Sequence, residues 1–272
     1  MIRGAAPALA LVLGVVSAGC GSDLGPASTP AAVPVRIQLV HASAPLDTGA
    51  RDAIAMIGAR LVPETTQADL VVTDDPAAAA TAALANPGTH ILVVGAPPPA
   101  APAPNVRFVE FDRAGMAYLA GALAALRSPR IAVAEPADEL TAAFRAGAAA
   151  VRRGVSATSV ACGAATAAAV VYVPDPSCRP STPGALVIAP TRLAGARMLG
   201  LLGPRPAVVV AETVRSVQDG IFQPGVAVEG LREDAIGFSW ISPAVSQAAV
   251  DRLQHVEDRV RAETAPIPAL AS

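Results

Sequence analysis

The alternation of short aliphatic runs with longer helical stretches, which begins at Val35, constrains the fold of this chain more than any other feature. Eight runs have the length and composition of strands, at residues 35–40, 69–73, 90–94, 106–110, 130–134, 168–173, 185–189 and 207–210. Most are apolar throughout, as strands covered on both faces of a sheet must be. The stretches between them predict helices over 48–61, 76–86, 113–127, 138–153 and 191–202. This rhythm predicts an α/β fold built on parallel sheets.

The C-terminal part has a different pattern. Residues 226–231 and 235–239 are two further short apolar runs, joined by three charged residues, and they predict a hairpin. A stripe of apolar residues then predicts a final amphipathic helix, at Val245, Ala249, Leu253, Val256 and Val260.

Composition excludes several classes of protein. The 272 residues are 53% apolar and carry a formal charge of −2, which excludes a disordered chain and a basic nucleic-acid binder. All twenty basic residues are arginine. Because lysine is absent, Schiff-base catalysis and the lysine of a phosphate-binding P-loop are excluded as well.

The first twenty residues predict an export signal. Met1, Ile2 and Arg3 precede a short apolar core, and Ser17, Ala18 and Gly19 precede Cys20. The apolar run is too short to span a membrane. The segment resembles a bacterial lipoprotein signal. The resemblance implies cleavage before Cys20 and attachment of lipid, including palmitate, at Cys20. The alternative is an ordinary secretory signal with an incidental cysteine.

Cys162 and Cys178 are the other two cysteines. An exported protein enters an oxidising compartment, so we expect a disulfide between them, and two buried free thiols are the alternative. We expect no metal site, because neither a His-Glu-x-x-His motif nor paired cysteine ligands occur. His90 and His255 are interpreted as structural, and we expect no cofactor and no enzymatic activity.

Two segments resemble the basic membrane protein family of lipid-anchored substrate-binding proteins. Residues 105–125 are similar to the first crossover of that family and contain its Tyr-Leu-Ala-Gly at 118–121. Residues 219–237 are similar to its Asp-Gly-x-Phe signature and the Gly-Leu that follows. The loop 41–47 lacks the family's Asp, Phe and Asn, and no acidic ribose-binding segment occurs near 204–213.

The resemblance implies a two-lobed periplasmic-binding-protein type I fold, each lobe a mostly parallel sheet flanked by helices. The implied organisation is a signal peptide at 1–19, a flexible tether at 20–34, an N-terminal lobe at 35–112, a second lobe at 113–205, and a return crossing with the hairpin and final helix at 206–272. The implied partners are a small solute, such as a nucleoside, an ABC permease, and the cell membrane through the N-terminal lipid on its extracytoplasmic face, with no nucleic acid.

Ligands of open parallel sheets bind beyond the carboxyl ends of the strands. This rule and the hinge position give ten candidate ligand-binding residues: His41, Ser43, Asp47, Asp74, Phe111, Asp112, Glu135, Asp175, Thr191 and Trp240. Several of the carboxylates have the alternative role of capping a helix or starting a turn. Phe111 and Trp240 can equally stack on a ligand or fill the core.

Solute capture for an ABC importer is therefore the expected function. The alternative is a degenerate surface lipoprotein that keeps the scaffold, has lost ligand capture and acts in interactions. A hydrolase on the same sheet is a weaker third possibility. Aromatic residues make up only 3% of the chain, which favours a smaller or more polar ligand, or none.

Overall fold

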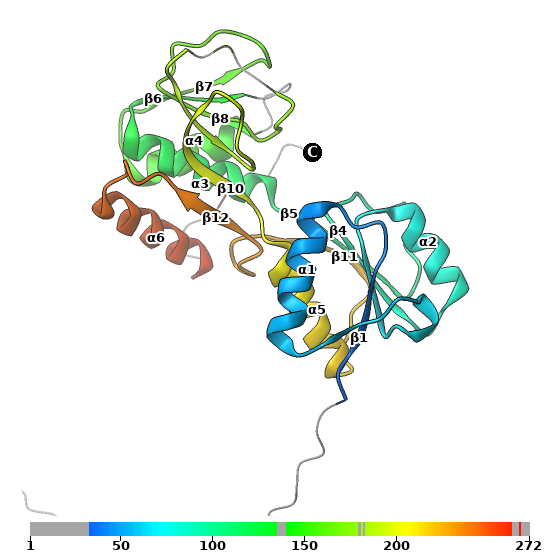
Figure 1. The fold of residues 1–272 in the computed structure, drawn as a ribbon. Coiled ribbons are helices and arrows are strands. Elements are labelled where there is room, and N and C mark those ends of the chain that lie inside the picture. Colours follow the sequence, from blue (N-terminus) through cyan, green and yellow to red (C-terminus); the bar gives the residue numbers. More distant parts are fainter. Residues whose placement is uncertain (1–32, 135–139, 179–180, 182, 263–266, 268–272) are drawn as a thin grey trace, which may run out of the picture. The chain divides into compact units, whose positions relative to one another are not determined.

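The computed structural model describes residues 33–134, 140–178, 181, 183–262 and 267. The expected signal peptide, Cys20, Glu135 and most of the expected tether lie outside the described residues. Within them, strands β1 to β12 form two six-stranded sheets, each with helices packed against it (Figure 1). We call the half built on each sheet a lobe: the first lobe is residues 34–112 and 205–235, and the second lobe is residues 113–204 and 236–267.

The sheet of the first lobe is parallel throughout. Its order is β11-β5-β4-β3-β1-β2, with strands β1 (Arg36–Leu39), β2 (Arg60–Leu61), β3 (Leu70–Thr73), β4 (His90–Val94), β5 (Val106–Phe111) and β11 (Gly225–Glu229). Helices α1 (Ala44–Ile57) and α5 (Pro206–Gln218) share one apolar core with this sheet, whereas α2 (Pro76–Ala85) belongs to a separate core. A short 3-10 helix, η1 (Thr65–Gln67), precedes β3.

The sheet of the second lobe has one antiparallel edge. Its order is β12-β10-β9-β8-β6-β7, with β6 (Arg130–Ala134), β7 (Ser156–Val160), β8 (Val170–Tyr172), β9 (Leu186–Ala189), β10 (Arg197–Pro204) and β12 (Ile236–Ile241). Only β12 runs antiparallel to its neighbour, β10. Helices α3 (Arg113–Arg127), α4 (Thr141–Val151) and α6 (Gln247–Arg261) form the main core with it. Loop residues such as Leu193 and Ala196 pack against a second apolar cluster of this sheet, around Val171 and Val187.

Local sequence explains where several helices begin. Asp112 caps α3 by accepting a hydrogen bond from the Gly115 amide, and Asp75 caps α2 by accepting from the Ala77 and Ala78 amides. Pro76 stands in the first turn of α2, where a missing amide hydrogen costs nothing. These caps determine where α3 begins after β5 and where α2 begins after β3.

The chain passes between the two sheets at three crossover segments. β5 of the first lobe leads through Asp112 into α3 of the second, and β10 of the second leads through Arg205 into α5 of the first. Residues 230–235 then connect β11 to β12. We call these segments crossover 1, crossover 2 and crossover 3.

Three sequence expectations are wrong. The expected helix over 191–202 is replaced by a loop and β10. Gly200 of β10 packs closely against the side chains of Phe238 and Leu123. The expected strand over 207–210 is the start of α5, whose valines pack into the core of the first lobe. The expected hairpin does not form, because β11 pairs with β5 and β12 pairs with β10 in the other sheet.

Other differences concern boundaries. The first helix covers 44–57 in place of 48–61, because Gly58 in a left-handed conformation ends it. Strands β2 and β7 were not expected from the sequence. The remaining expected strands lie close to the observed ones, and α3 spans the expected residues 113–127.

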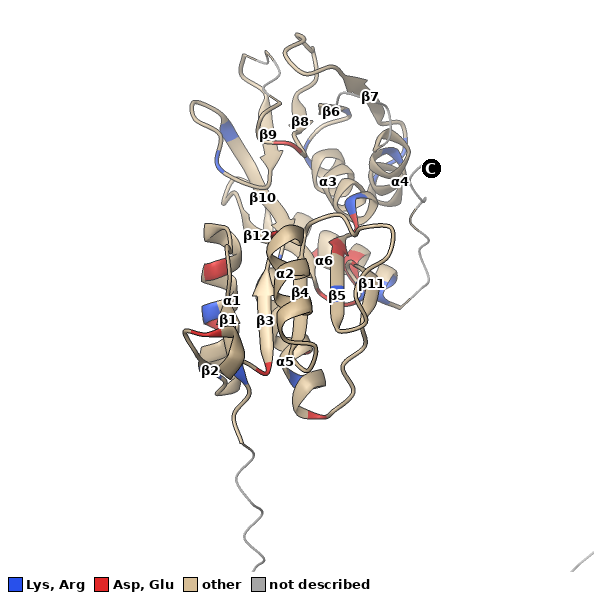
Figure 2. Ribbon diagram, turned by 90° about the vertical axis from the view of Figure 1, so that its right-hand side faces the viewer, with Lys and Arg blue, Asp and Glu red and all other residues tan. Residues whose placement is uncertain are grey.

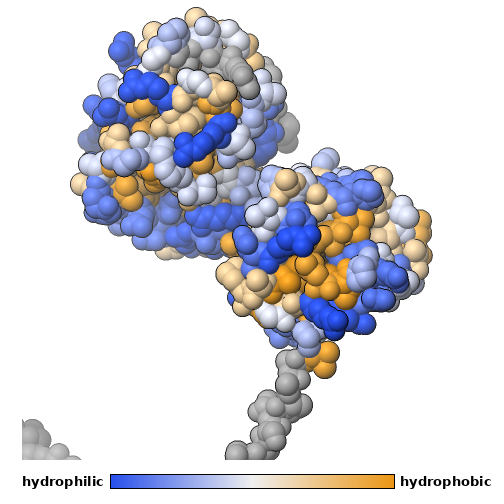
Figure 3. All heavy atoms as spheres, viewed as in Figure 1, coloured by the Kyte–Doolittle hydropathy of each residue, from blue (hydrophilic) through white to orange (hydrophobic). Residues whose placement is uncertain are grey.

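The surface of the first lobe carries some apolar side chains. Met56 is 72% exposed and Leu84 is 86% exposed. Figure 3 shows apolar surface on this lobe between α1 and α2. No helix within the described ranges is long and apolar enough to cross a membrane.

Candidate functional site

Three of the candidate residues come together at the carboxyl ends of β1 and β3. His41 follows β1 with a positive φ of 48°, which turns the chain directly after the strand. The amide of Ser43 then donates a hydrogen bond of 3.0 Å to the carboxylate of Asp74, which follows β3. Asp74 thereby holds the loop 41–43 in place at this edge of the sheet.

Asp47 is engaged within its own helix. Its carboxylate accepts two hydrogen bonds from the guanidinium of Arg51, at 2.8 and 3.0 Å, one turn further along α1. These bonds hold the pKa of Asp47 below its ordinary value. A ligand that used Asp47 would have to compete with this pair.

Phe111 and Asp112 line a hollow where β4 and β5 end and α3 begins. The hollow has a volume of about 660 Å³. The described residues that line it are Gly95, Pro97, Glu110, Phe111, Asp112, Arg113, Ala114, Met116, Pro204 and Val228. We call it the hinge hollow, because crossovers 1 and 2 contribute Asp112 and Pro204. Figure 2 shows acidic positions where β5 runs into α3.

The hinge hollow was only partly predictable. Phe111 and Asp112 were expected, whereas Glu110 and Val228 were missed. Glu110 and Val228 are partners in the β5–β11 register, so their side chains stand on the same face of the sheet. The signal that could have found Glu110 is its place one residue before the hinge aromatic, but only the pairing with β11 brings Val228 beside it.

Asp112 has two structural roles besides lining the hollow. Its side chain caps α3 with a bond of 2.9 Å from the Gly115 amide, and its own amide donates to the Glu229 carbonyl oxygen at 2.9 Å. Gly230 packs against it so closely that a Cβ there would stand 3.0 Å from the Asp112 Cβ. Crossovers 1 and 3 are therefore in direct contact.

The described candidates of the second lobe, Asp175, Thr191 and Trp240, do not line the hinge hollow. Asp175 is exposed and accepts a hydrogen bond of 2.8 Å from the Ser177 amide, which lowers its pKa. Thr191 is exposed in the loop after β9. Trp240 lies on β12, with the guanidinium carbon of Arg192 4.9 Å from its ring centroid. This cation covers a face of the indole on which a planar ligand could otherwise stack.

A buried ion pair lies beside crossover 3. Arg107 donates to Glu229 at 2.8 Å, and the Glu229 side chain is only 5% exposed. Burial raises the pKa of Glu229, an effect that the Arg107 charge opposes. Both Arg107 Nε and Glu229 Oε2 are buried without a hydrogen-bond partner. The pair therefore fixes β11 to β5 without satisfying all its polar atoms.

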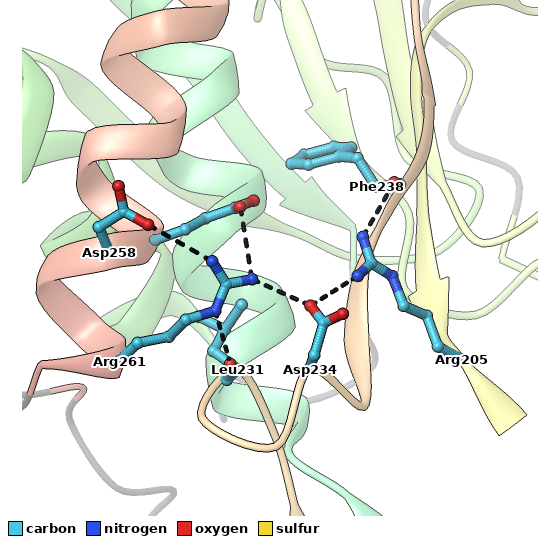
Figure 4. A network of polar contacts seen from close by, with 7 residues as sticks. Arg205, Leu231, Asp234, Phe238, Asp258 and Arg261 are labelled. Atoms are coloured by element: carbon cyan, nitrogen blue, oxygen red, sulfur yellow. Dashed lines mark hydrogen bonds and ion pairs between the residues drawn. The ribbon is translucent and has the colours of Figure 1, made fainter. Parts of the chain in front are cut away.

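A second ionic network joins crossovers 2 and 3 to α6 (Figure 4). One oxygen of Asp234 accepts from Arg205 at 2.6 Å and from Arg261 at 2.9 Å. Arg261 also donates to the Leu231 carbonyl oxygen, and Arg205 donates to that of Phe238. This network anchors both crossovers to the second lobe.

The expected disulfide between Cys162 and Cys178 is confirmed. Cys178 is buried in the apolar cluster that includes Val171 and Val187, whereas Cys162 is exposed. Within the described part of the chain, no three histidine, cysteine or acidic side chains are grouped as ligands of a metal ion.

Comparisons with solved structures identify the fold. The chain resembles an ABC transporter solute-binding protein from Conexibacter woesei with a TM-score of 0.63 and 17% identity, covering 86% of this chain and 98% of that one. The chain has the fold of type I periplasmic-binding proteins.

Other solved structures with this fold include proteins of different kinds. A transcriptional activator of the comK gene from Bacillus halodurans has a TM-score of 0.64 and 14% identity, over 86% of this chain and 99% of that one. A solute-binding protein of an ABC transporter system from Aeropyrum pernix has a TM-score of 0.53 and 14% identity, over 86% and 94%. No protein-family model matches the chain, and no curated protein does. At these identities the likeness concerns the fold.

Proposed function

We propose that this protein is a lipid-anchored extracytoplasmic solute-binding protein of an ABC importer, related to the basic membrane protein family. The observation that carries the proposal is the hinge hollow, in which two crossovers, an aromatic ring and carboxylates meet at the carboxyl ends of parallel strands. The similar proteins from Conexibacter woesei and Aeropyrum pernix are ABC transporter solute-binding proteins, which supports this kind of function.

The mechanism would follow from the crossovers. A solute bound in the hinge hollow contacts the first lobe through Phe111 and the second lobe through Met116, so it favours an arrangement in which both contacts are made. Closure about the three crossovers then presents the loaded protein to a permease. A nucleoside or another small polar solute is the proposed cargo.

A second candidate function is supported by a specific observation. Asp47, Asp112 and Asp175 all use carboxylate oxygens for bonds within the chain, and Arg192 covers a face of Trp240. Much of the expected recognition surface is therefore already occupied. This favours a surface lipoprotein that keeps the scaffold and has lost solute capture.

Thermal unfolding against a panel of nucleosides, sugars and amino acids separates the two functions. A solute at a hundredfold excess over its dissociation constant should stabilise the native protein by about 2.7 kcal/mol and raise the midpoint. Phe111→Leu should weaken that shift, because it removes the ring from the hollow. Met56→Leu, on an exposed part of α1, is the matched control and should keep it. A flat response to the whole panel favours the surface lipoprotein.

A further inference from the structure

We propose that the hinge hollow takes an organic cation, an ammonium or guanidinium group on a largely apolar frame; this inference rests on the proposed solute-binding function. Its volume of about 660 Å³ lies within the range of small-molecule sites. The charged and apolar side chains of its lining, and the charges around it, indicate the charge and the polarity of the ligand.

Glu110 provides the charge. Its half-buried side chain lines the hollow and makes no hydrogen bond or ion pair with another described residue. Asp112 adds a second carboxylate, of which only one oxygen is used to cap α3. Arg113, the cation among the described lining residues, is exposed and has an interaction partner of its own. A ligand cation can thus bind at Glu110 without displacing an internal partner of that side chain.

Apolar groups provide the rest of the lining. Phe111, Met116, Pro97 and Val228 contribute a ring, a thioether and aliphatic surface. An aromatic face and a nearby carboxylate are the two groups that hold alkylammonium ions most favourably. We therefore expect the apolar frame of the ligand to lie against this surface.

The helix that borders the hollow excludes anions. The first turn of α3 is the kind of positive helix end that attracts phosphate or carboxylate ligands. Here the Asp112 carboxylate already binds the Gly115 amide of that turn. An anionic ligand would therefore meet two carboxylates where it needs free amide hydrogens.

The distribution of charge between the two lobes also favours a cationic ligand. The first lobe has thirteen acidic residues against seven arginines, a formal charge of −6. In the second lobe, Arg130 and Arg197 begin strands β6 and β10, and Arg127 ends α3, so these positive charges stand at the strand ends away from crossover 1. The resulting field draws cations toward the hollow and weakens as salt screens it.

Three probes that share one frame test the inference. Phenethylammonium, 2-phenylethanol and phenylacetate differ mainly in charge, and calorimetry on the full chain measures their affinities. Phenethylammonium should bind at least about tenfold more tightly than either of the others, and its affinity should fall as salt rises. Choline, a monocation, and agmatine, a dication, test cationic ligands on other frames.

Variants at Glu110 assign the effect to the hollow. Glu110→Gln should weaken phenethylammonium binding about tenfold, whereas Asp219→Asn, at the exposed end of α5, should leave it unchanged. Glu110→Lys should reverse the preference toward phenylacetate. Thermal melting of each variant checks that it is folded.

The outcomes separate this inference from the function on which it rests. Tighter binding of neutral or anionic solutes, or a cation affinity unchanged in Glu110→Gln, overturns the cation assignment and leaves solute binding intact. Failure of every probe and every solute of the nucleoside, sugar and amino-acid panel overturns solute binding itself.

Discussion

Gly121 of α3 lies directly against the carbonyl oxygen of Phe144 in α4, so closely that a Cβ atom on Gly121 would overlap that oxygen. The contact is reciprocal, because Gly147 of α4 lies in the same way against the carbonyl of Tyr118. Two glycines in helices are ordinarily unfavourable. Here they let the backbones of α3 and α4 touch, and α3 contributes more residues to the core of the second lobe than any other element.

Gly121→Ala should therefore destabilise the protein, although alanine is the better helix former. Steric overlap with backbone that cannot rotate away should cost about 1–3 kcal/mol or more. Chemical denaturation measures the loss. Gly88→Ala is the control, since nothing lies within 4 Å of its Cβ position, and an equal loss in both variants would contradict the close-packing explanation.

Asp234→Asn should weaken the connection between crossovers 2 and 3 and α6. Asparagine tolerates the positive φ of 57° at this position, so the substitution removes charge with little backbone strain. Because the Asp234 side chain is 49% exposed, we expect a loss of only about 1 kcal/mol, which decreases at high salt. Asp258→Asn, whose bond to Arg261 is 3.5 Å, should change stability much less. Equal losses in the two variants, insensitive to salt, would argue against the network.

The disulfide should stabilise the segment between β7 and β9. Cys162 and Cys178 are 16 residues apart, and closing such a loop contributes roughly 3 kcal/mol in the chain-entropy model. Reduction, or Cys162→Ser with Cys178→Ala, should lower the unfolding midpoint. Mass mapping without reductant should recover the two cysteines in one linked peptide, and two free thiols would disprove the bridge in the native protein.

Stability should depend on pH through Glu229. Because burial raises its pKa, the native state keeps a proton that the unfolded state releases. The contribution of Glu229 to stability is therefore present below its ordinary pKa of 4.5 and is lost as pH rises through the raised native value.

Glu229→Gln should remove that part of the pH dependence, as measured by denaturation between pH 4.5 and 7. The variant leaves Arg107 without its partner, so the slope with pH, and not the stability itself, is the relevant readout. Glu64→Gln, on an exposed loop, is the control. A wild-type slope unchanged in Glu229→Gln would assign the effect to other groups, such as Glu212 and Glu257, whose pKa values burial also raises.

Lipidation of Cys20 predicts that the protein partitions into detergent. Cys20→Ser should abolish that partitioning, because no thiol remains to carry the lipid. Phase separation of membrane extracts measures it, with Ser22→Ala as the control. Unchanged partitioning of the Cys20 variant would indicate an ordinary secretory signal.

Local sequence was sufficient to predict the strands and helices for which the apolar pattern, the capping residue and the end signal agree. The strand predicted at 106–110, observed at 106–111, and the helix at 113–127 follow from apolar periodicity and the cap at Asp112. The disulfide between Cys162 and Cys178, which we expected from the predicted export signal, is also confirmed. In the hollow, local sequence placed Phe111 and Asp112 correctly at a crossover.

Tertiary structure decided which segments become strands in the last third of the chain and which sheet each one joins. Valines 208–210 favour a strand locally, but burial against the first sheet stabilises them in α5. Strands β11 and β12 are close in sequence and belong to different sheets, because their hydrogen-bond partners, β5 and β10, lie far away along the chain. The pairing of β11 with β5 also sets Val228 beside Glu110, and with it the apolar wall of the hinge hollow. The spacing of apolar residues in a segment indicates which of its side chains become buried. Which strand a segment pairs with depends on contacts with residues far away in the sequence, and these form only in the folded protein.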